Sequence, residues 1–303
     1  MTIALTGGTG FVGQAVVDLA RRRGIPLKAL ARREQAPREG VEWIRGDLAD
    51  RAALARLVEG ADVVLHVAGV VNAPDPAGFH LGNVAGTQAL VDLAVEAGVP
   101  RFVFVSSLAA REPGLSAYGE SKREAEERVQ ASALDWVIVR PPAIYGPRDR
   151  EMFELFRAAR WGVVPIPPAG GRASVIHVED LARLLVALLP ARPALSRRIF
   201  EPDDGREGGW DHADLARAIG QAMGHKVWAP HLPEWMLRAG AGLDRLVRGD
   251  RARLTPDRVG YMVHPDWVCR ADKAPPADLW KPEIPTPEGL AATARWYRQQ
   301  RWL

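Results

Sequence analysis

The sequence has almost no cysteine: Cys269 is the single one among 303 residues. One cysteine cannot close an intramolecular disulfide, and no second cysteine completes a zinc-binding pair with it. A disulfide-stapled fold is therefore excluded, and we expect no structural metal.

Long apolar runs are missing as well. No uncharged apolar stretch reaches the roughly 18 residues that a membrane-spanning helix needs. The chain opens directly into an apolar strand pattern, without the basic region and apolar stretch of a secretory leader. We therefore expect a cytoplasmic protein without a transmembrane segment.

An excess of charge of one sign is also absent, since 40 basic residues face 37 acidic ones and leave a formal charge of +3. Such a small, dispersed charge does not indicate a nucleic-acid partner. With 47% apolar and 25% charged residues, the composition is that of a globular protein and excludes disordered, collagenous and coiled-coil classes.

The first half of the chain alternates short apolar runs with helix-period segments, which is typical of βαβ units. Strands are predicted at 2–6, 27–31, 62–68, 101–106 and 136–139, and helices at about 11–24, 50–59, 80–98 and 117–132. The apolar runs are continuous, as in strands covered on both faces. The pattern predicts an α/β protein with a Rossmann-type, doubly wound parallel sheet and its ligand at the carboxyl ends of the strands.

Beyond about residue 150 the composition changes, because 15 of the 24 prolines and eight of the ten tryptophans fall in 151–303. Helix-period stretches lie near 150–161, 179–189, 211–223, 232–248 and 286–301. We therefore expect a nucleotide-binding core over 1–150 and a smaller, mostly helical substrate lobe over 151–303 that interleaves with the core. The amphipathic stretch 232–248 fits either a membrane-surface helix or a helix packed on a core, and the second interpretation is favoured.

A glycine-rich turn follows the first strand, with Gly7, Gly10 and Gly13 placed where the chain passes into a helix. The first glycine permits a tight turn, the second lets the backbone approach a pyrophosphate, and the third lets the helix pack on the strand. Free N–H groups at the helix start favour a phosphate there. Because a strand precedes the motif and a helix follows it, the turn predicts dinucleotide binding.

The second strand ends at Ala31, where an NAD site usually presents an acidic residue, and Arg32 and Arg33 follow it. Guanidinium groups suit a 2′-phosphate. NADP is therefore favoured over NAD, although two surface arginines followed by Glu34 leave NAD open.

A tyrosine and a lysine stand four residues apart at the start of the helix predicted at 117–132. That spacing puts Tyr118 and Lys122 on one helix face. A tyrosine with its ordinary pKa near 10 becomes useful as an acid or base at neutral pH when a buried ammonium favours the phenolate. Ser106 and Ser107 end the preceding strand, and a serine hydroxyl there would hold the substrate oxygen.

These motifs together resemble the extended short-chain dehydrogenases/reductases, the NAD-dependent epimerase/dehydratase superfamily, and the resemblance covers essentially the whole chain. Its matching segments are 6–13, 47–48, 66–69, 83–87, 106–107, 118–122 and 140–147. The resemblance implies Tyr118 as the acid/base, Lys122 as its tuner and ribose ligand, and Ser107, with Ser106 as fallback, as the substrate-oxygen donor. The segment 177–180 fits a recurring family segment with a structural role.

The resemblance also implies a cofactor site. Asp47 and Leu48 would border the adenine, Ala68 and Gly69 would line the cofactor channel, and Pro141, Ala143 and Ile144 would contact the nicotinamide amide. With the residues argued above, the expected cofactor-binding set is Gly7, Gly10, Phe11, Val12, Gly13, Arg32, Arg33, Asp47, Leu48, Ala68, Gly69, Lys122, Pro141, Ala143 and Ile144.

Departures from the family pattern narrow the function. Leu108 and Ala109 stand where sugar-nucleotide dehydratases carry an Asp-Glu pair, so 4,6-dehydratase chemistry is disfavoured. The short interval between Ser107 and Tyr118 resembles reductases and a branch related to an accessory subunit of respiratory complex I. We expect an NADP(H)-dependent oxidoreductase that acts on a carbonyl or alcohol of a small, apolar or aromatic substrate. A sugar or nucleotide-sugar epimerase and a non-catalytic NADP(H)-binding scaffold remain alternatives, and the resemblance leaves a homodimer open.

Overall fold

The computed structural model describes residues 1–249, 252 and 254–303, and the chain divides into two compact units. Unit 1 comprises 1–140, 181–201 and 275–280, and unit 2 comprises 141–180, 202–274 and 281–303. Unit 1 thus takes in two segments from beyond residue 150.

Unit 1 is built on a seven-stranded sheet in the order β10-β6-β5-β4-β1-β2-β3, with every neighbouring pair parallel. The strands are β1 (Ile3–Thr6), β2 (Leu27–Ala31), β3 (Val41–Arg45), β4 (Val63–His66), β5 (Arg101–Val105), β6 (Asp135–Val139) and β10 (Arg198–Phe200). All five residues of β5 are buried, as a strand covered on both faces requires. The predicted Rossmann-type sheet is confirmed.

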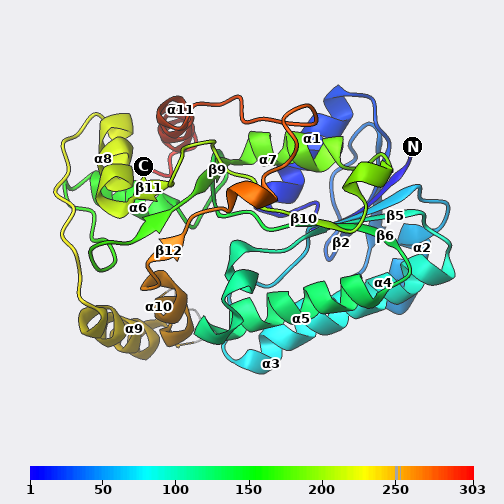
Figure 1. Cartoon of the computed structure of the whole chain (residues 1–303), viewed down its shortest axis with the longest axis horizontal. Helices are drawn as coiled ribbons and strands as arrows, with labels where there is room; N and C mark the ends of the chain where they lie inside the picture. The colour runs from blue at the N-terminus through cyan, green and yellow to red at the C-terminus, as the bar shows by residue number, and fades with distance from the viewer. Residues whose placement is uncertain (250–251, 253) are drawn as a thin grey trace. The chain divides into compact units, whose positions relative to one another are not determined.

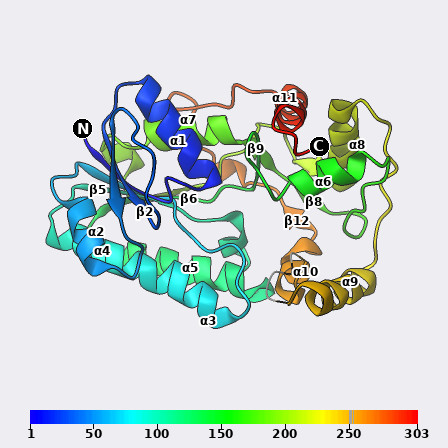
Figure 2. The same ribbon diagram turned by 180° about the vertical axis from the view of Figure 1, so that it is seen from behind.

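Helices cover both faces of this sheet (Figure 1). On one face lie α1 (Phe11–Arg22) and α7 (Val178–Ala187), the latter from Leu181 onward in unit 1; on the other lie α2 (Arg51–Val58), α4 (Gly86–Glu96) and α5 (Ala117–Ala131). The reverse view shows the same layering (Figure 2). The helix predicted at 80–98 is in fact α3 (Pro76–Phe79), a π-helical turn over His80–Ala85 and α4 in succession. Three 3-10 turns complete the unit at Leu108–Arg111, Pro113–Leu115 and Pro193–Leu195.

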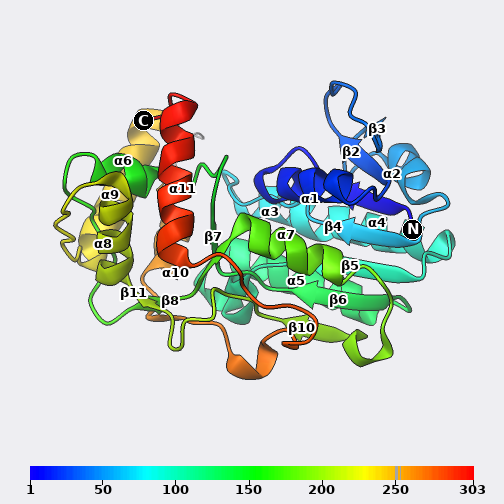
Figure 3. The same cartoon turned by 90° about the horizontal axis from the view of Figure 1, so that it is seen from above.

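Unit 2 combines short strand pairs with helices. Its strands are β7 (Ala143–Tyr145), β8 (Arg172–Ala173), β9 (Val175–His177), β11 (Trp210–Asp211) and β12 (Asp266–Trp267), and a 3-10 turn spans Ala271–Lys273. The helices α6 (Phe153–Ala159), α8 (His212–Met223) and α11 (Thr286–Gln299) lie together around one apolar core (Figure 3). The sequence predicts the mostly helical character of this part of the chain. It does not predict the strands, because two or three residues are too few to show the alternation of a strand.

Two further helices of unit 2, α9 (Glu234–Arg248) and α10 (Pro256–Met262), form a small cluster of their own. Only Leu237 and Ala241 of α9 are buried, and they pack with Val259 of α10. The prediction that the apolar face of 232–248 packs on a core is therefore wrong for most of that face. Leu246, for example, is 83% exposed.

Candidate functional site

The turn after β1 is closed so tightly that its glycines cannot be replaced without movement of the backbone. Gly7 has φ +75°, and a Cβ there would lie 2.6 Å from the Ala68 nitrogen. A Cβ on Gly13 would lie 2.0 Å from the Gly7 oxygen, and one on Gly10 would lie 3.2 Å from the same atom. The three glycines therefore bring β1, the end of β4 and α1 into direct backbone contact.

The first turn of α1 leaves its N–H groups available. Gly10 is the N-cap, and no side chain caps the helix. Phe11 and Val12, the first residues of α1, are half-buried. An uncapped helix start behind a glycine turn is suited to bind a phosphate through backbone N–H groups. The residues present thus fit the pyrophosphate of a dinucleotide.

The ends of β2 and β3 carry the residues expected at the adenosine part of a dinucleotide. Ala31 is buried at the end of β2, and Arg32 and Arg33 are exposed directly after it, where neither guanidinium makes a hydrogen bond or ion pair within the described residues. Asp47 is exposed, and its Oδ1 accepts a hydrogen bond from the Ala49 nitrogen at 2.9 Å. Leu48 packs against Gly86, where a Cβ would lie 2.9 Å from the Leu48 Cβ.

The ammonium of Lys122 is buried in unit 1. It donates a hydrogen bond to the Val105 carbonyl oxygen at 3.0 Å and lies 4.4 Å from the centroid of the Phe104 ring. A Cβ on Gly69 would lie 3.7 Å from Nζ, so the lysine reaches the loop after β4. Burial lowers its pKa to about 8, against the opposing charge of Glu126. The group stays mostly protonated at neutral pH.

Tyr118 stands one turn before Lys122, at the start of α5. Ser116 caps this helix by accepting a hydrogen bond from the Gly119 nitrogen at 2.9 Å. The Tyr118 ring is half-buried, with its centroid 6.0 Å from that of Phe79, and its carbonyl oxygen accepts a hydrogen bond from the Ser121 hydroxyl. The cap and the serine contact fix the backbone that carries the phenol.

The two serines at the end of β5 have different surroundings. Ser107 is half-buried, and its Oγ accepts a hydrogen bond from the Ala109 nitrogen at 3.2 Å, which caps the 3-10 turn that follows. The Ser106 hydroxyl is buried and has no hydrogen-bond partner within the described residues. Ser107, Tyr118 and Lys122 all belong to unit 1, whereas Pro141, Ala143 and Ile144 belong to unit 2, where Ala143 and Ile144 pair with Val175 and Ile176.

A buried polar chain next to the glycine turn was not predicted from the sequence. The Thr6 Oγ1 lies 2.6 Å from His66 Nδ1, and His66 Nε2 lies 2.9 Å from Thr87 Oγ1. Because the Thr87 hydroxyl donates to the Asn83 carbonyl oxygen at 2.5 Å, it accepts from Nε2–H. Nδ1 therefore accepts from Thr6, which in turn accepts from the Ala68 nitrogen at 3.2 Å. Only a neutral imidazole satisfies this chain, and burial, with Lys122 nearby, lowers the pKa of His66 to about 3.

Asn83 extends the chain toward α5. It lies in the π-helical turn, and its amide group pairs with the backbone of Val70 through Oδ1 at 2.7 Å and Nδ2 at 2.9 Å. Nδ2 also donates to the Ser121 hydroxyl at 2.9 Å. Asn83 thus links the loop after β4 to the helix turn that carries Tyr118. His66 and the segment 83–87 belong to the family motifs in the sequence, but the sequence does not indicate which of their side chains form hydrogen bonds with each other.

A buried ion cluster fixes the other side of α5. Arg140 donates two hydrogen bonds to the Glu126 carboxylate, at 2.8 and 2.5 Å, and lies 3.6 Å from Glu201. Arg111, on the turn after Ser107, lies 3.8 Å from the other oxygen of Glu201. The cluster therefore ties α5, the ends of β6 and β10, and the serine-bearing loop together within unit 1.

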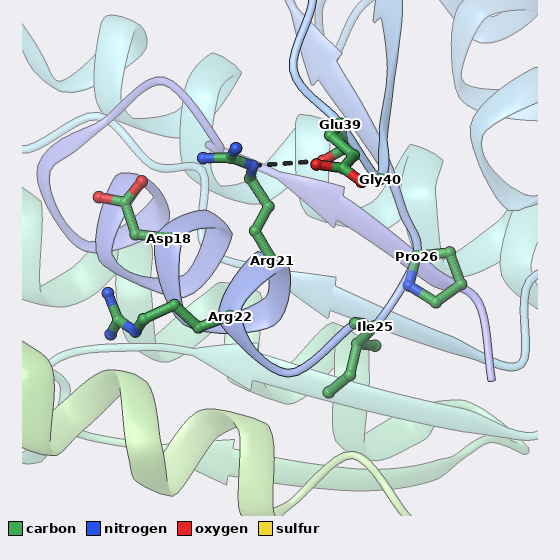
Figure 4. Close-up of a pocket in the computed structure, with 8 residues that line it drawn as sticks. Asp18, Arg21, Arg22, Ile25, Pro26, Glu39 and Gly40 are labelled. Carbon is green, nitrogen blue, oxygen red and sulfur yellow. Dashed lines mark hydrogen bonds between the residues drawn. The ribbon is translucent and has the colours of Figure 1, made fainter.

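A separate hollow lies at the opposite edge of the sheet of unit 1 (Figure 4). It has a volume of about 520 Å³ and lies between the carboxyl end of α1 and the starts of β2 and β3. The Arg21 Nε crosses it to donate to the Glu39 carbonyl oxygen at 3.2 Å. None of the expected site residues lines it, since the glycine turn is at the carboxyl end of β1. The lining residues are Asp18, Arg21, Arg22, Gly24, Ile25, Pro26, Glu39 and Gly40.

Comparison with known proteins agrees with this geometry. An NAD(P)H-binding family model matches residues 7–191. Ceramide reductase of Caulobacter vibrioides is 38% identical to this chain and aligns with 99% of it and 96% of its own length. This chain belongs to the NAD-dependent epimerase/dehydratase superfamily of extended short-chain dehydrogenases/reductases.

A further relative and one solved structure are also similar to this chain. The 2-alkyl-3-oxoalkanoate reductase of Stenotrophomonas maltophilia is 35% identical over 66% of this chain and 70% of its own length. The solved structure of MoeE5 in complex with UDP-glucose and NAD superposes with a TM-score of 0.75 at 24% identity, covering 99% of each chain. The second likeness establishes the fold, and the family establishes a nicotinamide dinucleotide as the cofactor.

Proposed function

We propose that this chain is an NADPH-dependent reductase of a ketone on a long-chain lipid, of the class to which an N-acylated sphingoid base belongs. The observation that carries the chemistry is the buried Lys122 one helical turn after Tyr118, beside the loop that closes on the glycine turn. The substrate class is supported by the 38% identity to a ceramide reductase along the whole chain, and the reacting group by a relative that reduces 3-oxoalkanoates.

The proposed roles follow from the chemistry of each side chain. The glycine turn and the start of α1 would hold a nicotinamide dinucleotide, which would supply the hydride that reduces the carbonyl carbon. The Tyr118 phenol gives its proton to the carbonyl oxygen, and the Ser107 hydroxyl donates a hydrogen bond to the same oxygen. The Lys122 ammonium, held in place by the Val105 carbonyl oxygen, stabilises the phenolate that remains.

The cofactor preference is part of the proposal. The glycine turn and the uncapped start of α1 fit the pyrophosphate of either dinucleotide. Arg32 and Arg33 are exposed directly after β2, and the last residue of β2 is Ala31 instead of the acidic residue that is usual in an NAD site. The two arginines therefore favour the 2′-phosphate of NADPH. We expect Arg32→Ala with Arg33→Ala to weaken NADPH binding about tenfold or more, or at least about 1.4 kcal/mol, and to leave NADH binding nearly unchanged.

The experiment that tests the function follows NADPH oxidation with an N-acylated 3-oxo sphingoid base presented in detergent micelles. We expect turnover by the wild-type protein, with at least a hundredfold loss in Tyr118→Phe and in Lys122→Met. Tyr297→Phe is the matched control, because Tyr297 is a buried tyrosine of unit 2 whose hydroxyl donates to the Asp149 carbonyl oxygen.

Two results would contradict the proposal. One is a Tyr118→Phe variant that turns over as fast as the wild type. The other is interconversion of a sugar nucleotide without net oxidation of NADPH, which would instead identify an epimerase.

A further inference from the structure

The helix α9 exposes most of its large apolar side chains. Trp235 is 69% exposed, Leu243 62% and Val247 74%, and Met236 is exposed as well. Together with Ala239 and Leu246, these residues form what we call the outer face of α9. Soluble proteins rarely present so many large apolar side chains next to one another, so the outer face requires a partner.

The outer face is distinct from the face by which α9 packs in unit 2. At about 100° per residue, its members fall within an arc of about 120° that contains no charged residue. Leu237 and Ala241 point to the other side of the helix, where they pack against α10. The helix is therefore apolar on two sides, and only the narrower side is covered within the described residues.

Arginines border the outer face. Arg238 and Arg245 lie along one edge of the apolar arc, and the helix has three arginines against two acidic residues. The acids are engaged by the protein: Glu234 pairs with Arg238, and Asp244 pairs with Arg248 and accepts a hydrogen bond from the Leu254 nitrogen at 2.9 Å. The long arginine stems can extend beside the apolar arc while their heads meet negative charge. Because the same ion pairs also occupy Arg238 and Arg248, the net charge of +1 on the helix is carried by Arg245, which has no ion pair within the described residues and is complementary to anionic headgroups.

We propose that α9 lies flat in the surface of an anionic lipid bilayer, with its outer face among the acyl chains and Arg238 and Arg245 among the headgroups. The choice of a lipid surface as the occupant rests on the proposed function, because a ceramide-like substrate resides in a bilayer. An apolar arc, a tryptophan and a basic edge are features of helices that bind in the plane of a membrane. Within the described residues no helix is long and apolar enough to cross a membrane.

A bilayer suits this single exposed face. Each exposed apolar side chain of the outer face contributes to burial in lipid by its own area, and no complementary protein surface is needed.

Flotation of the intact protein with vesicles tests the inference. The vesicles contain equal parts of phosphatidylcholine and phosphatidylglycerol, and neither cofactor nor substrate is present. We expect the variant Leu243→Gln with Leu246→Gln to bind at least about tenfold more weakly than the wild type. Val95→Gln is the matched control: it removes a 44% exposed apolar side chain from α4 and leaves binding unchanged. Circular dichroism and the unfolding midpoint verify that each variant folds.

A second pair of variants separates charge from apolar contact. Arg238→Gln with Arg245→Gln should weaken binding to the anionic vesicles several-fold and change binding to pure phosphatidylcholine little. Equal flotation of the wild type and the Leu243/Leu246 variant would overturn the inference. So would a dimer of the wild type that this variant dissociates while neither protein floats, because the second copy would then cover the face.

The outcome is independent of the test of function. Flotation with no turnover of the micellar 3-oxo lipid would remove the proposed substrate and keep the lipid contact. Turnover of the micellar lipid with no flotation would remove the lipid contact and keep the reductase.

Discussion

Lys122 should cost the protein stability at neutral pH, and the cost should disappear in alkaline solution. Burial lowers its pKa from 10.5 to about 8, so the folded protein releases this proton at lower pH than the unfolded chain does. Below about pH 8 both states hold the proton, and the buried charge is fully unfavourable. As the pH rises toward 10.5, the folded state loses the proton first. The free energy of unfolding therefore rises with pH across this window.

The magnitude follows from the two pKa values. A difference of about 2.5 between the two pKa values corresponds to about 3 kcal/mol, most of which is gained between about pH 7 and about pH 10. Lys122→Met keeps a side chain of similar length without the charge. In the difference between the two proteins, the contributions of all other groups that titrate in this range cancel. The stability of the wild type relative to Lys122→Met should thus increase by about 2 to 3 kcal/mol across the window.

Urea unfolding of both proteins without cofactor, at several pH values, measures this difference. Lys226→Met is the control, because Lys226 is exposed and carries no buried charge. A difference between the wild type and Lys122→Met that stays flat from about pH 7 to about pH 10 would refute a depressed pKa for Lys122. The variant is expected to be inactive while at least as stable as the wild type in neutral solution, as happens where a functional group is costly to bury.

Two other buried polar groups make separate predictions, both measured by urea unfolding. Thr87→Val leaves the Nε2–H of His66 without its acceptor and should lower the free energy of unfolding by about 1 to 3 kcal/mol. Thr87→Ser keeps the hydroxyl and should lower it less. Equal stability of Thr87→Val and the wild type would contradict the inferred tautomer of His66. Arg140→Met leaves Glu126 and Glu201 buried without their shared guanidinium, and it should lower the free energy of unfolding by about 3 to 5 kcal/mol at neutral pH. A decrease below about 1 kcal/mol would show that the two carboxylates find other partners.

The elements of the fold that could be predicted are those with a local period. The continuous apolar run of β5 and the amphipathic pattern of α1 each fix the type of element without knowledge of the rest of the chain. β10 has only three residues, and they become a strand because Ile199 pairs with Ile138 of β6. That pairing joins segments about 60 residues apart, and no local pattern encodes it.

The candidate site divides in the same way. The glycine turn and the pair Tyr118 and Lys122 are readable because their spacing alone places them, although their roles in catalysis and binding stay predictions. The hydrogen-bonded series through His66 cannot be predicted from the sequence, because Thr6 lies 60 positions before His66 and Thr87 lies 21 positions after it. For α9 the period predicts an amphipathic helix, but which apolar side is covered depends on where α10 packs.

The ion cluster beneath α5 should set the pH range in which the enzyme works. Glu126 lies one turn after Lys122 on the same helix, and its charge is the one that raises the pKa of Lys122 against the effect of burial. Glu126→Gln keeps the shape of the side chain and leaves Arg140 one acceptor oxygen, but it removes that charge. The pKa of Lys122 should then fall below about 8, and the alkaline limb of the NADPH-oxidation profile should move to lower pH, because activity requires the ammonium. A matched Glu127→Gln variant, whose exposed carboxylate pairs with Arg123, should leave the profile in place. If Glu126→Gln lowered stability without moving that limb, the cluster would act on the fold of α5 alone and not on the charge of Lys122.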